Sequence, residues 1–217
     1  NIFYGHTYVN GIEISKMNIE EASKAISEFL DKQAFVVKDS NQKSYEFSLK
    51  DDFGLNYELE ESLTSIKSQE DDLGIIEKLY SEKRYALNNL EINEEKFKEK
   101  ISSSQFYIDG NEDKTTDAYS VFSEDEEKFV IKEEYQGTDL IIEDFYAATK
   151  DLISKGIFEV DLSGGEYYHK PKVLSDNEAL VKKNNSLNEF IGAVITYKVP
   201  GGELVCGPST YYKWLTY

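Results

Sequence analysis

Short apolar segments of two different periods alternate along the chain. Residues 44–49 alternate apolar and polar side chains, which is the pattern of a strand in a sheet with one solvated face. Another set of apolar residues recurs with helical spacing, and this spacing predicts one apolar stripe on a helix that ends at about Asp31: Ile19, Ala22, Ile26, Phe29 and Leu30. Because the predicted strands are grouped in hairpins and mixed with helices, we expect an α+β fold with small, mainly antiparallel sheets.

Turn and helix-start signals separate these segments. Asn18 followed by Glu21 is a capping signal that starts a helix, and residues 175–178 (Ser-Asp-Asn-Glu) form another. Asn10-Gly11 and residues 200–202 (Pro-Gly-Gly) are hairpin turns. The patterns predict helices at about 19–31, 59–66, 73–80, 93–101, 142–154 and 178–192, and strands at about 2–14 (a pair), 34–38, 44–49, 84–90, 118–122, 129–134, 158–162, 193–199 and 203–206.

The chain has 217 residues, which is enough for one large domain or two small ones. Residues 102–116 are polar and rich in Ser, Asp, Asn and Lys, so they are the best candidate for a boundary. One unit occurs twice in the sequence: a segment that begins with Gly leads into an amphipathic helix, and strands follow. The two copies begin at residues 11–14 (Gly-Ile-Glu-Ile) and 137–140 (Gly-Thr-Asp-Leu). The sequence therefore predicts two α+β lobes, residues 1–105 and 106–217.

The charge balance restricts the partners. The chain carries 42 acidic and 24 basic residues, a net charge of −18. This balance argues against nucleic acid, whose phosphates require clustered Lys and Arg, and against contact of this fragment with an anionic membrane. No apolar run reaches the ~18–20 residues that span a bilayer. One Cys excludes an internal disulfide, and two His leave little for a metal site, so we expect neither metal nor cofactor.

Three residues could serve nucleophilic or acid–base catalysis. Cys206 is the only thiol, but it ends a predicted strand at a turn, where a small apolar residue packs well. His169 precedes Lys170-Pro171 with no Ser or Cys motif to complete a triad, and His6 is isolated in the first strand. We therefore interpret all three as structural residues and predict no catalytic residue.

Carboxylates and aromatics give no sharper signal. Residues 124–127 (Glu-Asp-Glu-Glu) fit a solvated turn, and residues 109–113 lack the ligand order of an EF-hand and fit a surface loop. No carboxylate pair stands out as a glycosidase site. Five aromatics could stack on sugars, but their spacing favours packing in the domain: Tyr167, Tyr168, Tyr211, Tyr212 and Trp214.

The order of motifs carries a resemblance. Residues 9–22 (VNGIEISKMNIEEA) look like the V-N-G-x-D-V-S-G-x-T-x-x-E-A start of a bacterial extracytoplasmic module. The series resembles the peptidoglycan-binding domain that precedes the catalytic domain of Gram-positive L,D-transpeptidases, over nearly the whole chain. Its later members are Asp117-Ala118-Tyr119, Phe129-Val130-Ile131, Gly137-Thr138-Asp139-Leu140, Val160-Asp161-Leu162, the run 167–173, the run 187–190, Ile195-Thr196-Tyr197 and Trp214-Leu215.

The resemblance implies an accessory module rather than an enzyme. The nucleophile of the family lies in a Ser-x-Gly-Cys-x-Arg motif with a His upstream. Cys206 follows Leu204-Val205 and precedes Gly207-Pro208, so it does not match and no catalytic residue carries over. Because the chain begins at Asn1 rather than Met, we expect a mature or truncated piece. The resemblance implies a membrane anchor before it, a catalytic domain after it, and a place at the cell wall or the outer membrane face.

Three functions remain open from the sequence. The first is a non-catalytic, wall-facing module that presents or orients a transpeptidase domain towards peptidoglycan. Amino groups on uncrosslinked stem peptides suit acidic patches, whereas anionic wall polymers repel them, so any direct wall contact is expected to be weak. The second is an interaction or adhesion module of a vancomycin-resistance W-type surface protein, since that type shares the module. The third is a hydrolase with an unrecognised carboxylate pair. The sequence identifies no ligand-binding residues.

Overall fold

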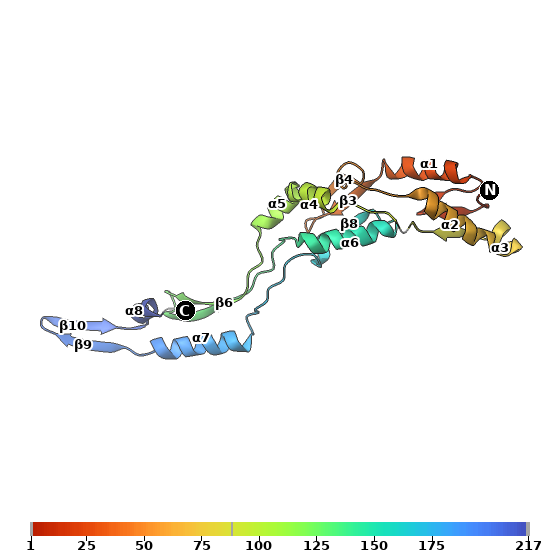
Figure 1. Ribbon diagram of the computed structural model, residues 1–217. Coiled ribbons are helices and arrows are strands. Elements are labelled where there is room, and N and C mark those ends of the chain that lie inside the picture. Colours follow the sequence, from red (N-terminus) through yellow and green to blue (C-terminus); the bar gives the residue numbers. More distant parts are fainter. Residues whose placement is uncertain (1, 88, 216–217) are drawn as a thin grey trace. The chain divides into compact units, whose positions relative to one another are not determined.

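A computed structural model describes residues 2–87 and 89–215 (Figure 1). The fold is α+β, with eight helices among the described residues and sheets of two or three strands, as predicted. The chain divides into two compact units: unit 1 contains Asn1–Glu112 and Leu140–Tyr168, and unit 2 contains Asp113–Asp139 and His169–Tyr217. The boundary predicted between residues 105 and 106 does not coincide with this division, because the chain passes between the units three times.

The first sheet of unit 1 joins the start of the chain to a segment some 75 residues later. Its central strand β1 (Thr7–Val9) pairs antiparallel with β2 (Ile12–Glu13) and parallel with β5 (Lys83–Tyr85). The predicted Asn10-Gly11 turn joins β1 to β2, and both residues have positive φ, +48° and +82°. This conformation explains the turn signal, since Asn and Gly tolerate it best.

The second sheet of unit 1 brings distant segments together in the same way. Strand β3 (Ala34–Lys38) pairs antiparallel with β4 (Ser44–Ser48), and both lie where the sequence predicted short strands. On its other edge β3 pairs in parallel with β8 (Glu159–Asp161), and Val37 lies opposite Val160. Both valines are buried, so this pairing carries part of the core.

The helices of unit 1 follow the predicted pattern with one exception. In the predicted capping box, Asn18 Oδ1 accepts the Glu21 N–H at 2.8 Å and the Glu21 carboxylate accepts the Asn18 N–H at 2.9 Å. This reciprocal cap fixes the start of α1. The helices are α1 (Ile19–Leu30), α2 (Leu59–Asp71), α3 (Ile75–Tyr80), α4 (Glu94–Ser102), α5 (Gln105–Glu112) and α6 (Ile142–Ser154).

The exception is α5, where the sequence predicted a polar boundary and a surface loop over residues 109–113. The loop prediction is wrong for most of this segment, because it is helical to Glu112. Phe106 explains the difference: it is buried, and its ring lies 5.2 Å from Tyr45 and 6.2 Å from Phe47. One buried aromatic on a polar helix stabilises it through tertiary contact, which composition does not reveal.

The core of unit 1 is built around a cluster of aromatic rings in contact. The Phe53 ring centroid lies 4.7 Å from Phe97, 5.5 Å from Phe47 and 5.9 Å from Phe35. Phe97 in turn contacts Phe145 of α6 at 5.5 Å. All five rings are buried, so this cluster joins the second sheet to helices α4 and α6.

Unit 2 contains two hairpins and one long helix: the hairpin of β6 (Tyr119–Ser123) and β7 (Lys128–Lys132), helix α7 (Glu178–Ile191), and the hairpin of β9 (Ile195–Val199) and β10 (Gly202–Cys206). Helix α7 packs along the β6–β7 hairpin, and asparagine side chains of the helix hydrogen-bond the backbone of β7 as a neighbouring strand would. The Asn188 amide accepts the Phe129 N–H at 2.7 Å and donates to the Phe129 carbonyl at 2.8 Å. After β10 the chain forms α8 (Pro208–Tyr211) and a final 3-10 turn (Tyr212–Trp214).

The backbone at Gly137 passes so close to residues 113–115 that there is no room for a side chain. A Cβ at this position would lie 2.1 Å from the backbone oxygen of Asp113 and 2.6 Å from the backbone of Lys114 and Thr115. Beside it, the Asp139 carboxylate accepts the Thr115 N–H at 2.9 Å and is buried. Burial raises the pKa of Asp139, but hydrogen bonds from Thr115 outweigh it and hold the pKa below its ordinary value.

We predict that Gly137→Ala lowers the free energy of unfolding by about 1–3 kcal/mol, because the added methyl group must displace backbone. Urea denaturation followed by circular dichroism measures the change. Gly202→Ala is the matched control in the same unit, since a Cβ there meets nothing within 4 Å. A loss for Gly137→Ala no larger than for the control would contradict the tight contact.

We also predict a pH-dependent contribution from Asp139. Its folded pKa lies below the unfolded one, so its contribution is complete above pH ~4 and disappears as the pH falls through the folded pKa. Asp139→Asn should therefore be less stable than the native chain at pH 7, and this difference should shrink by pH 3. Unfolding free energies at both pH values test this; a difference that is constant with pH would rule out the linkage.

Candidate interaction surfaces

Cys206 lies at the end of β10, is 8% exposed, and its carbonyl accepts the Tyr211 hydroxyl at 3.0 Å. This placement agrees with the predicted packing role at a hairpin end. His169 is exposed, and its backbone is hydrogen-bonded: its N–H donates to the Asp139 carbonyl, and its carbonyl accepts from Thr115 and Gln136. These contacts position a loop rather than an imidazole.

His6 is also exposed, at φ +61°, and its carbonyl accepts the Lys83 N–H at 2.8 Å. The acidic turn 124–127 is exposed as predicted, yet two of its carboxylates anchor the last helical turns. Glu127 accepts the Ser209 hydroxyl at 2.7 Å, and Glu124 accepts the Tyr212 hydroxyl at 3.1 Å. The turn is therefore a structural support as well as a charged surface.

The aromatic residues divide into packed and exposed members. Tyr168 is buried and Tyr167 packs on the core of unit 1, which confirms the packing prediction for both. Tyr212 stacks on Phe122 with ring centroids 3.9 Å apart and planes 4° apart. Trp214 differs from the prediction, because 67% of it is exposed on the final helical turn. Among the described residues, no group of three His, Cys, Asp or Glu could hold a metal ion.

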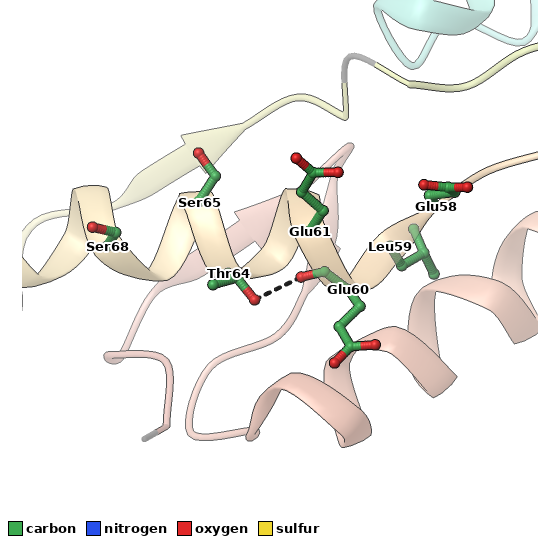
Figure 2. A pocket seen from close by; sticks show the side chains of 7 residues that line it. All are labelled: Glu58, Leu59, Glu60, Glu61, Thr64, Ser65 and Ser68. Carbon is green, nitrogen blue, oxygen red and sulfur yellow. Dashed lines mark hydrogen bonds between the residues drawn. The ribbon is translucent and has the colours of Figure 1, made fainter.

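An open polar hollow lies along the first half of α2, with a volume of about 850 Å³ (Figure 2). Its floor is Leu59, and its walls carry carboxylates and hydroxyls that are all exposed. Figure 2 shows Glu61 and Ser65 on one side of the helix and Glu60 on the other, so the carboxylates diverge. Separate hydrogen-bonding groups along a helix suit an extended polar chain better than a compact ligand. The remaining wall residues are Glu58, Thr64 and Ser68.

The carboxylates of the hollow also have a role within the helix. Glu60 and Glu61 lie in the first turn of α2, where a negative charge interacts favourably with the helix dipole. Glu60 also borders a second hollow between α1 and α2, together with Ser23 and Lys24. The charge of the hollow is thus compatible with the stability of α2, and does not need a ligand to balance it.

Helix α3 presents its apolar face to solvent. Ile75 and Leu79 are one helical turn apart, as are Ile76 and Tyr80, so the four side chains form one stripe. Their exposed fractions range from 54% to 79%. The sequence predicted a helix here but gave no sign that its apolar stripe faces water.

The opposite, polar side of α3 is tied to the protein. Lys78 donates to the Asp71 carbonyl at 2.7 Å, and the Glu77 carboxylate accepts the Gly74 N–H at 3.0 Å. The buried Lys83 ammonium donates to the carbonyls of Gly5 and Ser81 at 2.8 Å, and it lies 3.3–3.4 Å from two carbonyls of α3. Polar contacts therefore fix α3 with its apolar stripe outwards, which is the reverse of an ordinary surface helix.

The start of the chain is tied to α2 beside this helix. The buried Glu70 carboxylate accepts the Tyr4 N–H at 3.2 Å and the Thr7 hydroxyl. Lys67 lies 3.9 Å from Glu70 and 2.6 Å from Asp71, and its ammonium stands 4.2 Å above the Tyr4 ring. This buried polar network was not predicted, since isolated Lys and Glu on a helix usually face solvent.

A third surface lies in unit 2, where the β9–β10 hairpin leaves most of its residues exposed. In the part of the chain that the structure covers, no helix is long and apolar enough to cross a bilayer. Comparisons of the chain with protein-family models, curated proteins and solved structures find no match.

We predict that Ile76→Ser changes the free energy of unfolding by less than about 0.5 kcal/mol, because Ile76 is three-quarters exposed. Leu63→Ala in the neighbouring α2 is the comparison, and should cost about 2–5 kcal/mol because Leu63 is fully buried. Chemical denaturation measures both. A large loss for Ile76→Ser would show that the stripe packs on the protein.

Proposed function

We propose that the chain is a non-catalytic, extracytoplasmic module that presents or orients an L,D-transpeptidase domain towards peptidoglycan. The observation that carries this proposal is the ordered motif series, which resembles the domain preceding the catalytic domain in Gram-positive L,D-transpeptidases. In this proposal the parent chain supplies the nucleophile in a following domain, and the present chain supplies placement at the wall.

The positions of the motif residues support a module defined by its fold. Asn10 turns β1 into β2, and its side-chain oxygen accepts the Leu87 N–H at 2.9 Å. Asn18 and Glu21 cap α1, and Gly137 permits the close backbone approach described above. Each of these residues shapes the backbone rather than offering a reactive group. A motif series of this kind suits a scaffold whose task is position.

The hollow on α2 supports direct contact with the wall. Its exposed carboxylates and hydroxyls match the ammonium and amide groups of uncrosslinked stem peptides. Because the carboxylates diverge along the helix, they suit an extended strand that makes several weak contacts. Exposed ion pairs contribute little each, so binding through this surface is weak and multivalent.

The second candidate is the interaction module of a vancomycin-resistance W-type surface protein. The outward stripe of α3 favours it, since such an apolar surface suits a protein partner. The sequence of the parent chain separates the two candidates: a Ser-x-Gly-Cys-x-Arg motif after Tyr217 supports the transpeptidase host, and any other domain there supports the alternative.

We predict that purified sacculi retain the chain at low salt and that Glu60→Gln/Glu61→Gln reduces this retention. Two exposed ion pairs of about 0.5 kcal/mol each correspond to a loss of about fivefold in affinity. A sedimentation assay with the bound fraction measured over a range of sacculus concentrations gives the affinity.

The control is Asp125→Asn/Glu133→Gln, which removes two exposed carboxylates from unit 2 and changes the net charge equally. Retention of the control should match the native chain. Equal loss in both variants would assign the effect to net charge, and no retention of the native chain would leave placement without direct wall binding.

A further inference from the structure

The β9–β10 hairpin has one apolar and one largely polar face, and its register assigns each residue to a face. Tyr197 lies opposite Leu204, and Ile195 lies opposite Cys206. Since alternate residues of a strand share a face, these side chains and Val199 lie together. We call this set the hairpin face: Ile195, Tyr197, Val199, Leu204 and Cys206. The other face carries Thr196 opposite Val205 and Lys198 opposite Glu203.

The hairpin face is open to solvent. Ile195, Tyr197, Val199 and Leu204 are each 43–55% exposed. Figure 1 shows the two strands extending away from α7 and α8, and each strand has one strand partner in the residues that the structure describes. A two-stranded hairpin is only marginally stable alone in water. Its stability therefore benefits from anything that covers this face.

Aromatic residues extend the apolar surface at the base of the hairpin. The Tyr211 hydroxyl bonds the Cys206 carbonyl, and the Trp214 ring lies 5.3 Å from the Tyr211 ring with most of its area exposed. The exposed parts of the hairpin face and of Trp214 together amount to an apolar area on the order of 500 Å². In this estimate each exposed fraction is applied to the full area of its side chain, which is about 150–250 Å² for an aromatic residue. This is as large as the largest patch of a typical monomer.

Local charge permits a second copy to approach this surface. Residues 190–215 contain two Lys and one Glu, a net charge of +1 in a chain of −18. Two carboxylates from another segment, Glu124 and Glu127, do reach Tyr212 and Ser209, but they lie at the base of the hairpin and not on its strands. A lipid surface fits less well, because the open strand edges would place unpaired backbone N–H and C=O groups in a medium without water.

We propose that two copies of this chain associate through their hairpin faces, packed against each other about a twofold axis. Two such patches bury on the order of 1,000 Å², which is the lower limit for a specific interface. The dimer is therefore weak, as expected of an interface at the low end of the size range. This association is independent of the proposed wall binding, because it uses unit 2 and needs no sacculus.

Analytical ultracentrifugation of the native chain between about 10 and 500 μM tests the proposal, at about 0.1 M and 0.5 M NaCl. We expect a monomer–dimer equilibrium that strengthens at higher salt, because salt screens the repulsion between acidic chains and leaves apolar contact intact. A chain that stays monomeric throughout, or a dimer that dissociates as salt rises, would overturn the proposal.

Two double variants locate the contact. Tyr197→Lys/Leu204→Lys places a cross-strand lysine pair on the hairpin face, and should raise the dissociation constant about tenfold or more. Thr196→Lys/Val205→Lys places the same pair one residue along, on the other face, with the same change in net charge. This control should keep the native dissociation constant within about threefold.

Circular dichroism and thermal melts confirm that both variants remain folded before they are compared. Equal weakening in both variants, or none in either, would show that the hairpin face is not the interface. Retention on sacculi is read separately, so that a failure of wall binding and a failure of self-association remain distinguishable.

Discussion

The parallel pairing of β3 with β8 is the contact on which the organisation of the chain depends. It returns a segment near residue 160 to a sheet begun near residue 35, with Val37 opposite Val160 in the core. A parallel pair requires a long connection. Here that connection includes helices α4, α5 and α6 and the first part of unit 2. Helix α6 lies directly before this return, and its Phe145 adds to the aromatic cluster through Phe97.

Local signals predicted much of the fold. The Asn18–Glu21 cap, the Asn10-Gly11 turn and the Pro200-Gly201-Gly202 hairpin depend on neighbouring residues only, and each forms where the sequence placed it. The α+β class followed from the same patterns. The parallel pairs β1–β5 and β3–β8 were not predicted, because pairing between distant strands depends on tertiary topology rather than on local period.

The candidate surfaces were harder to predict than the elements that carry them. Periodicity identified an apolar stripe on residues 73–80, but the same stripe can face a core or solvent. Polar contacts decide the question here, since Lys83 and Lys78 hold the polar side of α3 against the protein. The hairpin face shows the same ambiguity, because alternation predicts two faces and says nothing of what covers either. Of the five aromatics that the spacing assigned to packing, Trp214 is the one found exposed.

The three passages of the chain between its units have a consequence for biosynthesis. Unit 1 lacks α6 and β8 until residue 161 has been made, and by then the segment 113–139 of unit 2 has already been made. Unit 2 in turn waits for α7, so neither half can complete its structure while the chain is still short. A ribosome that releases the polypeptide from its amino end therefore exposes residues 113–139 before either unit is complete, and both units finish folding only after their later segments have emerged.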